Sequence, residues 1–245
     1  MKIGFSLSPF FKDESIKYLK PLAFIKSIFY FPLFIVPIFV FFIALPQTRE
    51  LTLSLLDENG PVETFTFLLL LIASIMGFIL ILSPLISKDK KIIRLLLFFF
   101  SFGLFFAAME EIAWGQQLFK FKTPDSFYDL NAQHELTLHN INSLQGKSEI
   151  FRLIFGIGGL LAMLLGKTKK LSVLATPKIL LSFFIVITSV TLVDLFADFY
   201  NINHNLDMLL QRLSELIELL IAMSGFFYIL LIRKRLIKPK DLCLK

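Results

Sequence analysis

Residues with the side chains needed for chemistry are concentrated between positions 107 and 142. This stretch holds adjacent carboxylates, the only tryptophan and two of the 3 histidines of the chain: Glu110, Glu111, Trp114, His134 and His139. The sequence on either side is rich in aliphatic residues and phenylalanine, and ionisable groups at a membrane boundary are costly unless they are paired or functional. The pattern therefore predicts a functional site here.

The elements that must position this site are membrane-spanning helices. With 56% hydrophobic residues and 30 Phe, the chain is too apolar for one soluble domain. A span needs about 20 apolar residues, and the sequence offers six such segments: Ile28–Leu45, Phe65–Ile86, Leu95–Met109, Phe151–Leu165, Ile179–Leu195 and Leu216–Ile232. We expect an all-α integral membrane bundle of six transmembrane helices over residues 1–245, with an interfacial loop between spans 3 and 4.

The distribution of Lys and Arg predicts the orientation of this bundle. If the spans alternate, most of the 25 basic residues fall on one side, which is then cytoplasmic. Residues 1–27 become a cytoplasmic interfacial lead-in, 115–149 an outer loop and 233–245 a basic cytoplasmic tail. We expect a multi-pass protein of the bacterial cytoplasmic (inner) membrane with both termini inside. The net charge of +6 favours anionic lipid headgroups as partners and argues against nucleic acid.

The carboxylates fall mostly at the opposite, outer ends of the predicted helices. At about 1.5 Å per residue, Glu110, Asp194 and Glu218 each lie roughly 22–24 Å above the basic residue that starts or ends their helix. In a hydrocarbon core about 30 Å thick, all three share one layer just below the outer surface. Helical spacing also groups these acids with polar or small residues on three predicted bundle-facing stripes: Gly103, Ala107, Glu110, Trp114 and Gln117; Thr191, Asp194, Asp198 and Asn201; Glu215, Glu218, Ala222 and Gly225.

These stripes predict an outer-leaflet pocket covered by the loop that carries Glu135 and His139. Several carboxylates in one poorly solvated pocket need protons, a metal ion or arginines to balance them, and Arg152 and Arg212 are the nearest basic candidates. Carboxylate and imidazole together can bind a divalent metal ion such as zinc, iron or manganese. The candidate ligands or acid/base groups are Glu110, Glu135, His139, Asp194 and Glu218, with Glu111, Trp114, Gln117, Asp198 and Glu215 in support.

Simpler interpretations stand beside this one. Acids at a helix end can face water, and Trp114 can be an interfacial anchor. Gly156-x-x-Gly159 predicts close helix packing rather than a phosphate-binding loop, and Ala73 and Gly77 also predict close packing.

The same residues resemble a pattern found in a family of uncharacterised bacterial polytopic membrane proteins. The likeness runs through Glu110-Glu111-x-x-Trp114-Gly115-Gln116 and through Asn131-x-Gln133-x-Glu135-x-x-Leu138-His139-Asn140. Glu58–Glu63 and Glu215-x-x-Glu218 extend it over most of the chain, while His134 and Thr137 depart from it. The resemblance implies a polytopic membrane protein and no particular activity.

Three functions fit the sequence. The first is a membrane-embedded, metal-dependent or acid/base enzyme acting on a lipid or lipid-linked substrate at the outer leaflet. The second is a cation- or proton-coupled transporter or channel component, which would need a polar path into the apolar inner halves of the helices. The third is a non-catalytic assembly or sensor protein. Homo-oligomerisation is compatible with all three.

Overall fold

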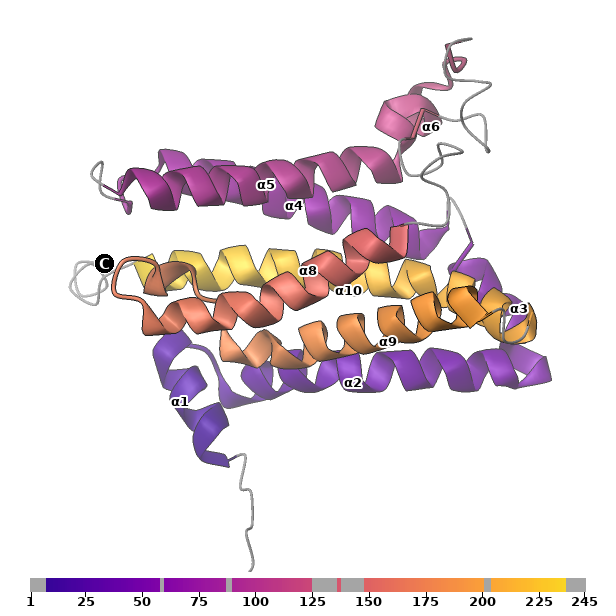
Figure 1. Cartoon of the computed structure of the whole chain (residues 1–245), viewed down its shortest axis with the longest axis horizontal. Coiled ribbons are helices and arrows are strands. Elements are labelled where there is room, and N and C mark those ends of the chain that lie inside the picture. The colour runs from indigo at the N-terminus through magenta and orange to yellow at the C-terminus, as the bar shows by residue number, and fades with distance from the viewer. Residues whose placement is uncertain are drawn as a thin grey trace, which may run out of the picture.

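The computed structural model of the chain describes residues 8–57, 60–86, 90–124, 136–137, 148–200 and 204–236. Within these ranges every regular element is a helix, and six helices are long and apolar enough to cross a membrane. Figure 1 shows the long helices running side by side in one bundle. The predicted all-α bundle of six spans is confirmed.

Each predicted span overlaps one long helix, although several helices extend further into their polar flanks. The long helices are α2 (Leu22–Ala44), α4 (Pro61–Leu82), α5 (Lys91–Glu111), α8 (Ser148–Ala162), α9 (Leu181–Tyr200) and α10 (His204–Leu236). Shorter elements are α1 (Ser8–Tyr18), α3 (Pro46–Leu55), η1 (Ala113–Gly115), α6 (Gln116–Phe119), η2 (Met163–Lys167), η3 (Ser172–Leu174) and η4 (Lys178–Leu180). Helix α3 lies between the first two predicted spans, and proline at its first position is a common helix start.

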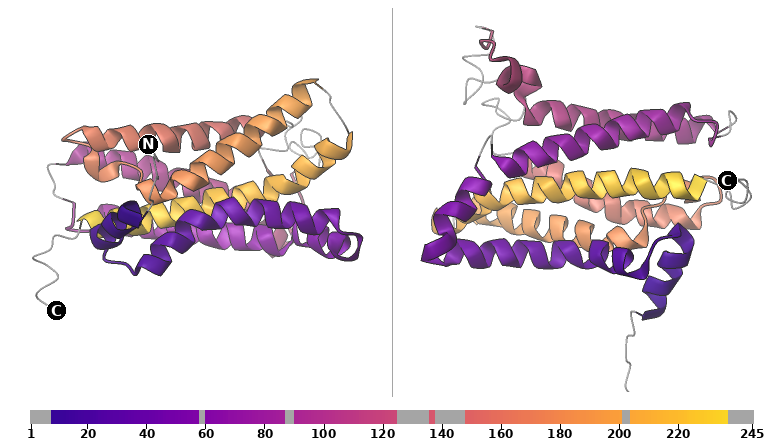
Figure 2. Two further views of the ribbon diagram at one scale, coloured as in Figure 1. Left: turned by 90° about the horizontal axis from the view of Figure 1, so that it is seen from below. Right: turned by 180° about the vertical axis from the view of Figure 1, so that it is seen from behind.

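Helix α10 is the centre of the bundle. It packs against α4, α9, α8, α2 and α1, and Figure 2 shows it running between the α4–α5 pair and α2. Its side chains enter all three hydrophobic clusters of the core, for example Ala222 beside α4 and α5, Ile217 beside α9, and Leu216 beside Leu56. Side chains on several sides of α10 are therefore buried against other helices.

Small residues set the closest helix contacts, as predicted. A Cβ atom added at Gly77 of α4 would lie 2.1 Å from the Ser101 hydroxyl of α5. One added at Gly156 of α8 would lie 2.5 Å from the Thr188 hydroxyl of α9, and one at Gly159 would lie 2.0 Å from the Phe184 ring. These distances are too short for any side chain, so glycine permits the observed approach of the helix backbones.

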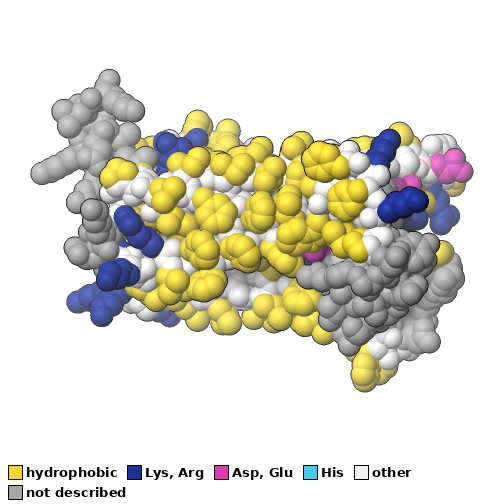
Figure 3. All heavy atoms as spheres, turned by 90° about the horizontal axis from the view of Figure 1, so that it is seen from above, with side chains coloured by type: hydrophobic (Ala, Val, Ile, Leu, Met, Phe, Trp, Pro, Cys, Tyr) yellow, Lys and Arg dark blue, Asp and Glu magenta, His cyan; other side chains and the backbone are white. Residues whose placement is uncertain are grey.

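The outer surface of the bundle is apolar over its middle. Large hydrophobic side chains are exposed along several helices, including Phe34, Phe41, Phe99, Ile154 and Phe196. Figure 3 shows hydrophobic side chains across the middle of one face, with Lys and Arg side chains gathered toward the ends. Exposed apolar surface of this extent fits contact with lipid.

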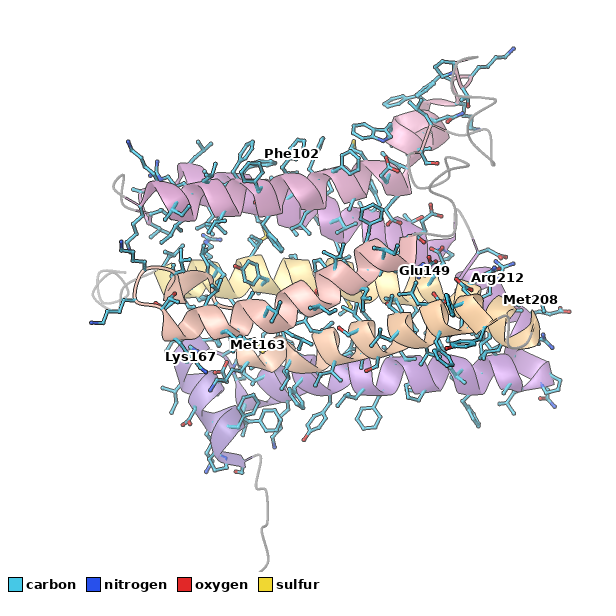
Figure 4. The ribbon with its side chains drawn as sticks, in the orientation of Figure 1. Phe102, Glu149, Met163, Lys167, Met208 and Arg212 are labelled. Atoms are coloured by element: carbon cyan, nitrogen blue, oxygen red, sulfur yellow. The ribbon has the colours of Figure 1, made fainter. Side chains whose placement is uncertain are left out.

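The two ends of the bundle differ in charge. We call the acidic end the one at which α4, α8 and α10 begin and α5 and α9 end. Figure 4 shows Glu149 and Arg212 at this end and Lys167 at the other. The opposite, basic end carries the Lys and Arg residues of α1, of 90–94, of 167–178 and of 233–235.

Candidate functional site

The interior face of α5 leads to Glu111. The buried residues of this helix are Ile93, Leu97, Ser101, Leu104 and Ala108, and continuing their 4-4-3-4 spacing by three residues reaches Glu111. The stripe predicted to face the bundle began at Gly103, yet Gly103 is exposed and a Cβ atom added there would meet nothing within 4 Å. That orientation was wrong, because polar and small residues lie on two neighbouring faces of α5 and packing selected the other one.

Glu111 lies at the same level as Glu218 on the central helix. A Cβ atom added at Gly225 of α10 would be 2.9 Å from Leu104 of α5, which fixes the relative height of the two helices. Glu218 precedes Gly225 by seven residues, and Glu111 follows Leu104 by seven residues. Both carboxylates are therefore about 10 Å further toward the acidic end, and both side chains are half-buried.

Other carboxylates surround this pair. Glu111 interacts electrostatically with Glu218, Glu215 and Glu63, and also with its neighbour Glu110. Among the described residues, the charged groups that interact electrostatically with Glu111 are all acidic. We call Glu63, Glu111, Glu215 and Glu218 the acidic cluster. Three helices, α4, α5 and α10, thus bring carboxylates together at one end of the bundle.

A buried hydroxyl lies at the level of Glu111. Thr66 belongs to the interior face of α4, is 1% exposed, and its Oγ1 has no hydrogen-bond partner. Counting from the contact between Gly77 and Ser101, Thr66 and Glu111 are both about 15–17 Å toward the acidic end. Glu63 lies one turn above Thr66 on the same face of α4. Thr66 is therefore a buried hydroxyl residue at the level of Glu111 and Glu218.

Glu110 is oriented by Trp114. The indole Nε1–H of Trp114 donates a hydrogen bond of 2.6 Å to Glu110 Oε1, and its ring packs edge-on against Phe106 at 5.3 Å. The backbone here is left-handed at three successive residues, with φ of 45° at Ala113, 54° at Trp114 and 92° at Gly115. Left-handed conformation costs about 1–2 kcal/mol for a residue other than glycine, so the contacts of this turn must offset that cost.

Gln116 connects the end of α5 to the following loop. Its side-chain amide donates to Thr123 Oγ1 at 2.7 Å, and its Oε1 accepts the backbone N–H of Leu136 at 2.8 Å. These contacts place residues 136–137 beside Gln116. The candidate residues Glu135 and His139 lie outside the described residues, as does the side chain of Gln117, so their predicted roles stay predictions.

Asp194 lies in a separate ion cluster between α8 and α9. The guanidinium of Arg152 lies 3.8 Å from Asp194 Oδ2 and donates a hydrogen bond of 2.9 Å to Glu149 Oε1. All three residues are buried, with 8% or less of each exposed. Arg152 also donates to Ser148 Oγ at 2.9 Å. The prediction that arginine balances the carboxylates thus applies to Asp194 and Arg152.

The remaining candidates lie nearer the surface. Arg212 forms an ion pair with Asp57, and about half of each side chain is exposed. Asp198 is exposed near the end of α9, whereas Glu215 is half-buried and belongs to the acidic cluster. The structure therefore brings Glu218 and Glu215 to Glu111, Glu110 to Trp114, and Asp194 to Arg152. A single site that contains Glu110, Asp194 and Glu218 together stays a prediction.

No group of three or more His, Cys, Asp or Glu residues in the described part of the chain is arranged to hold a metal ion. The predicted ligand set includes Glu135 and His139, which lie outside the described residues. The predicted metal site is therefore not tested by this finding.

Two acidic residues at the site were not among the candidates. Glu149 lies one turn before Arg152 on α8, and the i, i+3 spacing of opposite charges was a usable signal for the pair. Glu63 follows Gly60-Pro61 in the first turn of α4, where an acid is usually explained by the helix dipole. Its part in the acidic cluster depends on how α4 packs against α5, which spacing along one helix does not encode.

The fold and the site together define a polytopic, all-α membrane protein with buried carboxylates at one end of its bundle. Comparisons of the chain with protein-family models, with curated proteins and with solved structures find no match. Its function is therefore argued from the geometry.

Proposed function

We propose that the chain is a membrane-embedded enzyme that acts on a lipid or lipid-linked substrate at the outer leaflet, with Glu111 and Glu218 as its acid/base pair. One observation carries this proposal: α5 and α10 hold these two carboxyl groups at one level of the bundle, close enough to interact electrostatically. The carboxylate of Asp194, by contrast, is already paired with the guanidinium of Arg152.

Two neighbouring carboxyl groups supply both halves of general acid/base catalysis. Like charges in a poorly solvated site share protons rather than ionise together. The ionised member can accept the proton of an attacking water or hydroxyl, while the protonated member donates a proton to the leaving oxygen of the substrate. The total number of protons on the pair is unchanged. Transfer or hydrolysis at a headgroup ester or phosphoester can use these two proton transfers.

The position of the pair fits a lipid substrate. Glu111 is the last residue of the 21-residue helix α5, so it lies about 30 Å from Lys91 at the other end. This distance matches the thickness of the hydrocarbon core, which supports a position of the pair at the depth where lipid headgroups begin. Glu110, next to Glu111 in the sequence, accepts a hydrogen bond from Trp114, and Gln116, five residues after Glu111, binds the backbone of Leu136.

Lipid turnover tests the proposal. The purified protein is reconstituted in liposomes made from a total lipid extract of bacterial membranes, and lipid species are followed by mass spectrometry. We expect wild type to convert at least one lipid species, and Glu111→Gln or Glu218→Gln to slow this conversion by about 10²–10⁴-fold. Glu50→Gln, which changes an exposed acid on α3, is the matched control. If no lipid species changes, or if both Gln variants keep the wild-type rate, the proposal is wrong.

A cation- or proton-coupled transporter is the second candidate. Below the acidic cluster, the hydroxyls of Ser74 on α4 and Ser101 on α5 are fully buried and have no hydrogen-bond partner. With Thr66 they extend polar groups to the middle of the bundle. A proton flux into proteoliposomes that falls in Ser74→Ala and Ser101→Ala variants, without lipid turnover, would favour transport.

A further inference from the structure

We infer that α1, η4 and the last turn of α10 form a binding site for the phosphate group of an anionic lipid at the basic end of the bundle. The site consists of Lys17, Lys178 and Arg235, which we call the basic cluster. The inference is independent of the proposed function, because it concerns the opposite end of the molecule. It also goes beyond the general attraction of a basic chain to anionic membranes, since it assigns the lipid to three particular side chains.

Tyr18 brings two of these cations together. Since the Nζ of Lys17 and the Cζ of Arg235 lie 5.3 and 5.4 Å from the centroid of the same Tyr18 ring, they are at most about 11 Å apart. Lys17 is exposed, and lysine carries its charge on a flexible stem. One phosphate group that accepts hydrogen bonds of about 2.7–2.9 Å on two sides can therefore bridge Lys17 and Arg235.

Arg235 is held in place by neutral groups. Its Nε donates a hydrogen bond of 2.9 Å to the Tyr18 hydroxyl, to which Nη2 also donates. Its Nη1 donates to the backbone carbonyls of Val173 and Ala175. In the described part of the chain, no acid forms an ion pair with Arg235. The guanidinium is thus fixed in position while its positive charge is not neutralised by a carboxylate there.

Lys178 adds a third positive charge beside Lys17. Helix α1 packs against both η4 and α10, and Lys17 interacts electrostatically with Glu14, Arg235 and Lys178. Glu14 Oε1 lies 3.5 Å from the Nζ of Lys17, so one carboxylate stands against three cations. Burial lowers the pKa of Lys17, and the two neighbouring cations lower it further, whereas Glu14 acts in the opposite direction. A bound anion would relieve the repulsion among the cations.

The orientation of α1 supports a position of the basic cluster at the membrane surface. Figure 1 shows α1 running across the direction of the long helices at the basic end. Such a helix lies along the membrane surface when the bundle spans the bilayer. Arg235 belongs to the last turn of α10, and Lys178 directly precedes α9. All three cations are therefore at the helix ends, where headgroups of the nearer leaflet lie.

Apolar side chains beside the cluster point to a lipid as the source of the phosphate group. Ile16 and Leu19 flank Lys17 in the sequence and are 74% and 62% exposed. Leu19 has a left-handed backbone with φ of 50°, a conformation that is unfavourable for leucine. Contact with acyl chains at the boundary of the headgroups explains two exposed apolar side chains beside Lys17, whereas a soluble phosphate ester would have no use for them.

Native mass spectrometry of the full chain in detergent tests the inference. The probes are phosphatidylglycerol and phosphatidylcholine with identical acyl chains, which differ in the net charge of the headgroup. We expect wild type to retain phosphatidylglycerol about tenfold or more tightly at neutral pH, because lysine and arginine near the surface attract anionic lipids. Lys17→Gln and Lys178→Gln should each reduce this preference, and the double variant should reduce it most. Lys17→Arg should keep it.

Lys12→Gln is the matched control. Lys12 is exposed on the same helix and is rotated from Lys17 by about 140° around the helix axis, so this variant loses the same charge outside the cluster. It should leave the preference unchanged. If Lys12→Gln reduces the preference as much as Lys17→Gln does, overall charge binds the lipid and the inference is wrong.

The variants can be checked for folding independently. Lys17 and Lys178 are exposed, so their Gln variants should unfold at the wild-type temperature. Equal binding of the two lipids to wild type would overturn the inference, and so would a preference that is unchanged in the double variant.

A second arm tests the source of the phosphate. Glycerophosphoglycerol carries the same headgroup without acyl chains. If it competes as strongly as phosphatidylglycerol, the ligand is a soluble phosphate ester and the lipid assignment is wrong. Leu19→Asn keeps a residue that tolerates the left-handed backbone and should weaken the binding of both lipids. Unchanged binding would remove the contact with acyl chains and, with it, the lipid assignment.

Discussion

At the scale of single residues, Glu110 and Glu111 illustrate how neighbours in a helix acquire different environments. Successive residues are rotated by about 100° around the helix axis. Glu111 consequently faces α10 and its carboxylates, while Glu110 accepts the hydrogen bond of Trp114. A Glu111→Gln substitution therefore changes the acidic cluster directly, whereas Glu110→Gln changes the contact that orients the end of α5.

The ion pairs of Arg152 and Arg212 should differ strongly in their contribution to stability. Removing one partner of a buried ion pair leaves a buried unpaired charge and costs about 3–5 kcal/mol, whereas an exposed pair contributes up to about 1 kcal/mol. Arg152→Met should therefore lower the free energy of unfolding far more than Arg212→Met does. Chemical unfolding of both variants in the same detergent measures the difference.

A second-site change separates charge from packing in this experiment. Adding Glu149→Gln and Asp194→Asn to Arg152→Met removes the unpaired carboxylates and should restore part of the lost stability. Equal losses for Arg152→Met and Arg212→Met would show that the Arg152 cluster is not held in a buried, low-dielectric place.

Tyr18 should make the protein less stable at alkaline pH. Burial of the side chain raises the pKa of the Tyr18 hydroxyl above its usual value of about 10, although Arg235 nearby acts in the opposite direction. The unfolded chain loses this proton above about pH 10 while the folded chain keeps it. The stability due to Tyr18 is thus complete below pH 10 and falls above it, by up to about 1.4 kcal/mol per pH unit.

The measurement compares wild type with Tyr18→Phe between about pH 9 and pH 12. The Phe variant should start less stable, because Arg235 loses the hydroxyl that its Nε contacts at 2.9 Å, and should fall less steeply with pH. Burial lowers the pKa of Lys17, so Lys17 makes the stability rise with pH, opposite to Tyr18. Both proteins contain Lys17, so its effect cancels in the comparison. Parallel curves for the two proteins would contradict the assignment to Tyr18.

At the scale of elements, the α8–α9 contact depends on Gly159 and not on its neighbour Gly158. A Cβ atom at Gly159 would lie 2.0 Å from the Phe184 ring, whereas one at Gly158 would meet nothing within 4 Å. Gly159→Ala should destabilise the protein by about 1–3 kcal/mol through overpacking. Gly158→Ala should be neutral or stabilise it by up to about 1 kcal/mol, because alanine is the better helix former.

Thermal unfolding of the two alanine variants checks this prediction, since each adds the same methyl group one residue apart. Adding Phe184→Leu to Gly159→Ala should recover part of the loss by making room for the methyl group. If the two glycine variants unfold at the same temperature, α8 and α9 are not packed through Gly159.

At the scale of the whole molecule, the orientation in the membrane remains a prediction from Lys and Arg. The bundle has an acidic and a basic end, and a basic end is expected to be cytoplasmic. Ser54 on α3 and Thr168 after η2 are exposed at opposite ends. In a Cys243→Ser background, a membrane-impermeant thiol reagent applied to intact cells should label Ser54→Cys and not Thr168→Cys. The reverse pattern would invert the topology.

The sequence by itself determined the spans and the separation of charge. Both depend on local properties, namely the length of each apolar run and the residues that flank it, and these do not change when the helices pack. The close contacts at Gly77, Gly156 and Gly159 could be predicted for the same reason, because small residues in an apolar helix have few other uses. The depth of Glu218 likewise depends only on counting residues along one helix.

Tertiary structure decided which faces meet. On α5, the stripe through Gly103 and Glu110 and the stripe through Ser101 and Glu111 are both plausible interior faces, and they differ by about 100° of rotation about the helix axis. The contacts of Gly77 with Ser101 and of Gly225 with Leu104 selected the second. Glu111 met Glu218 and Glu63 as a result, while Asp194 met Arg152 on α8. The rotation of a helix about its axis depends on the side chains of both helices in the contact, and the sequence of one helix specifies only its own side chains.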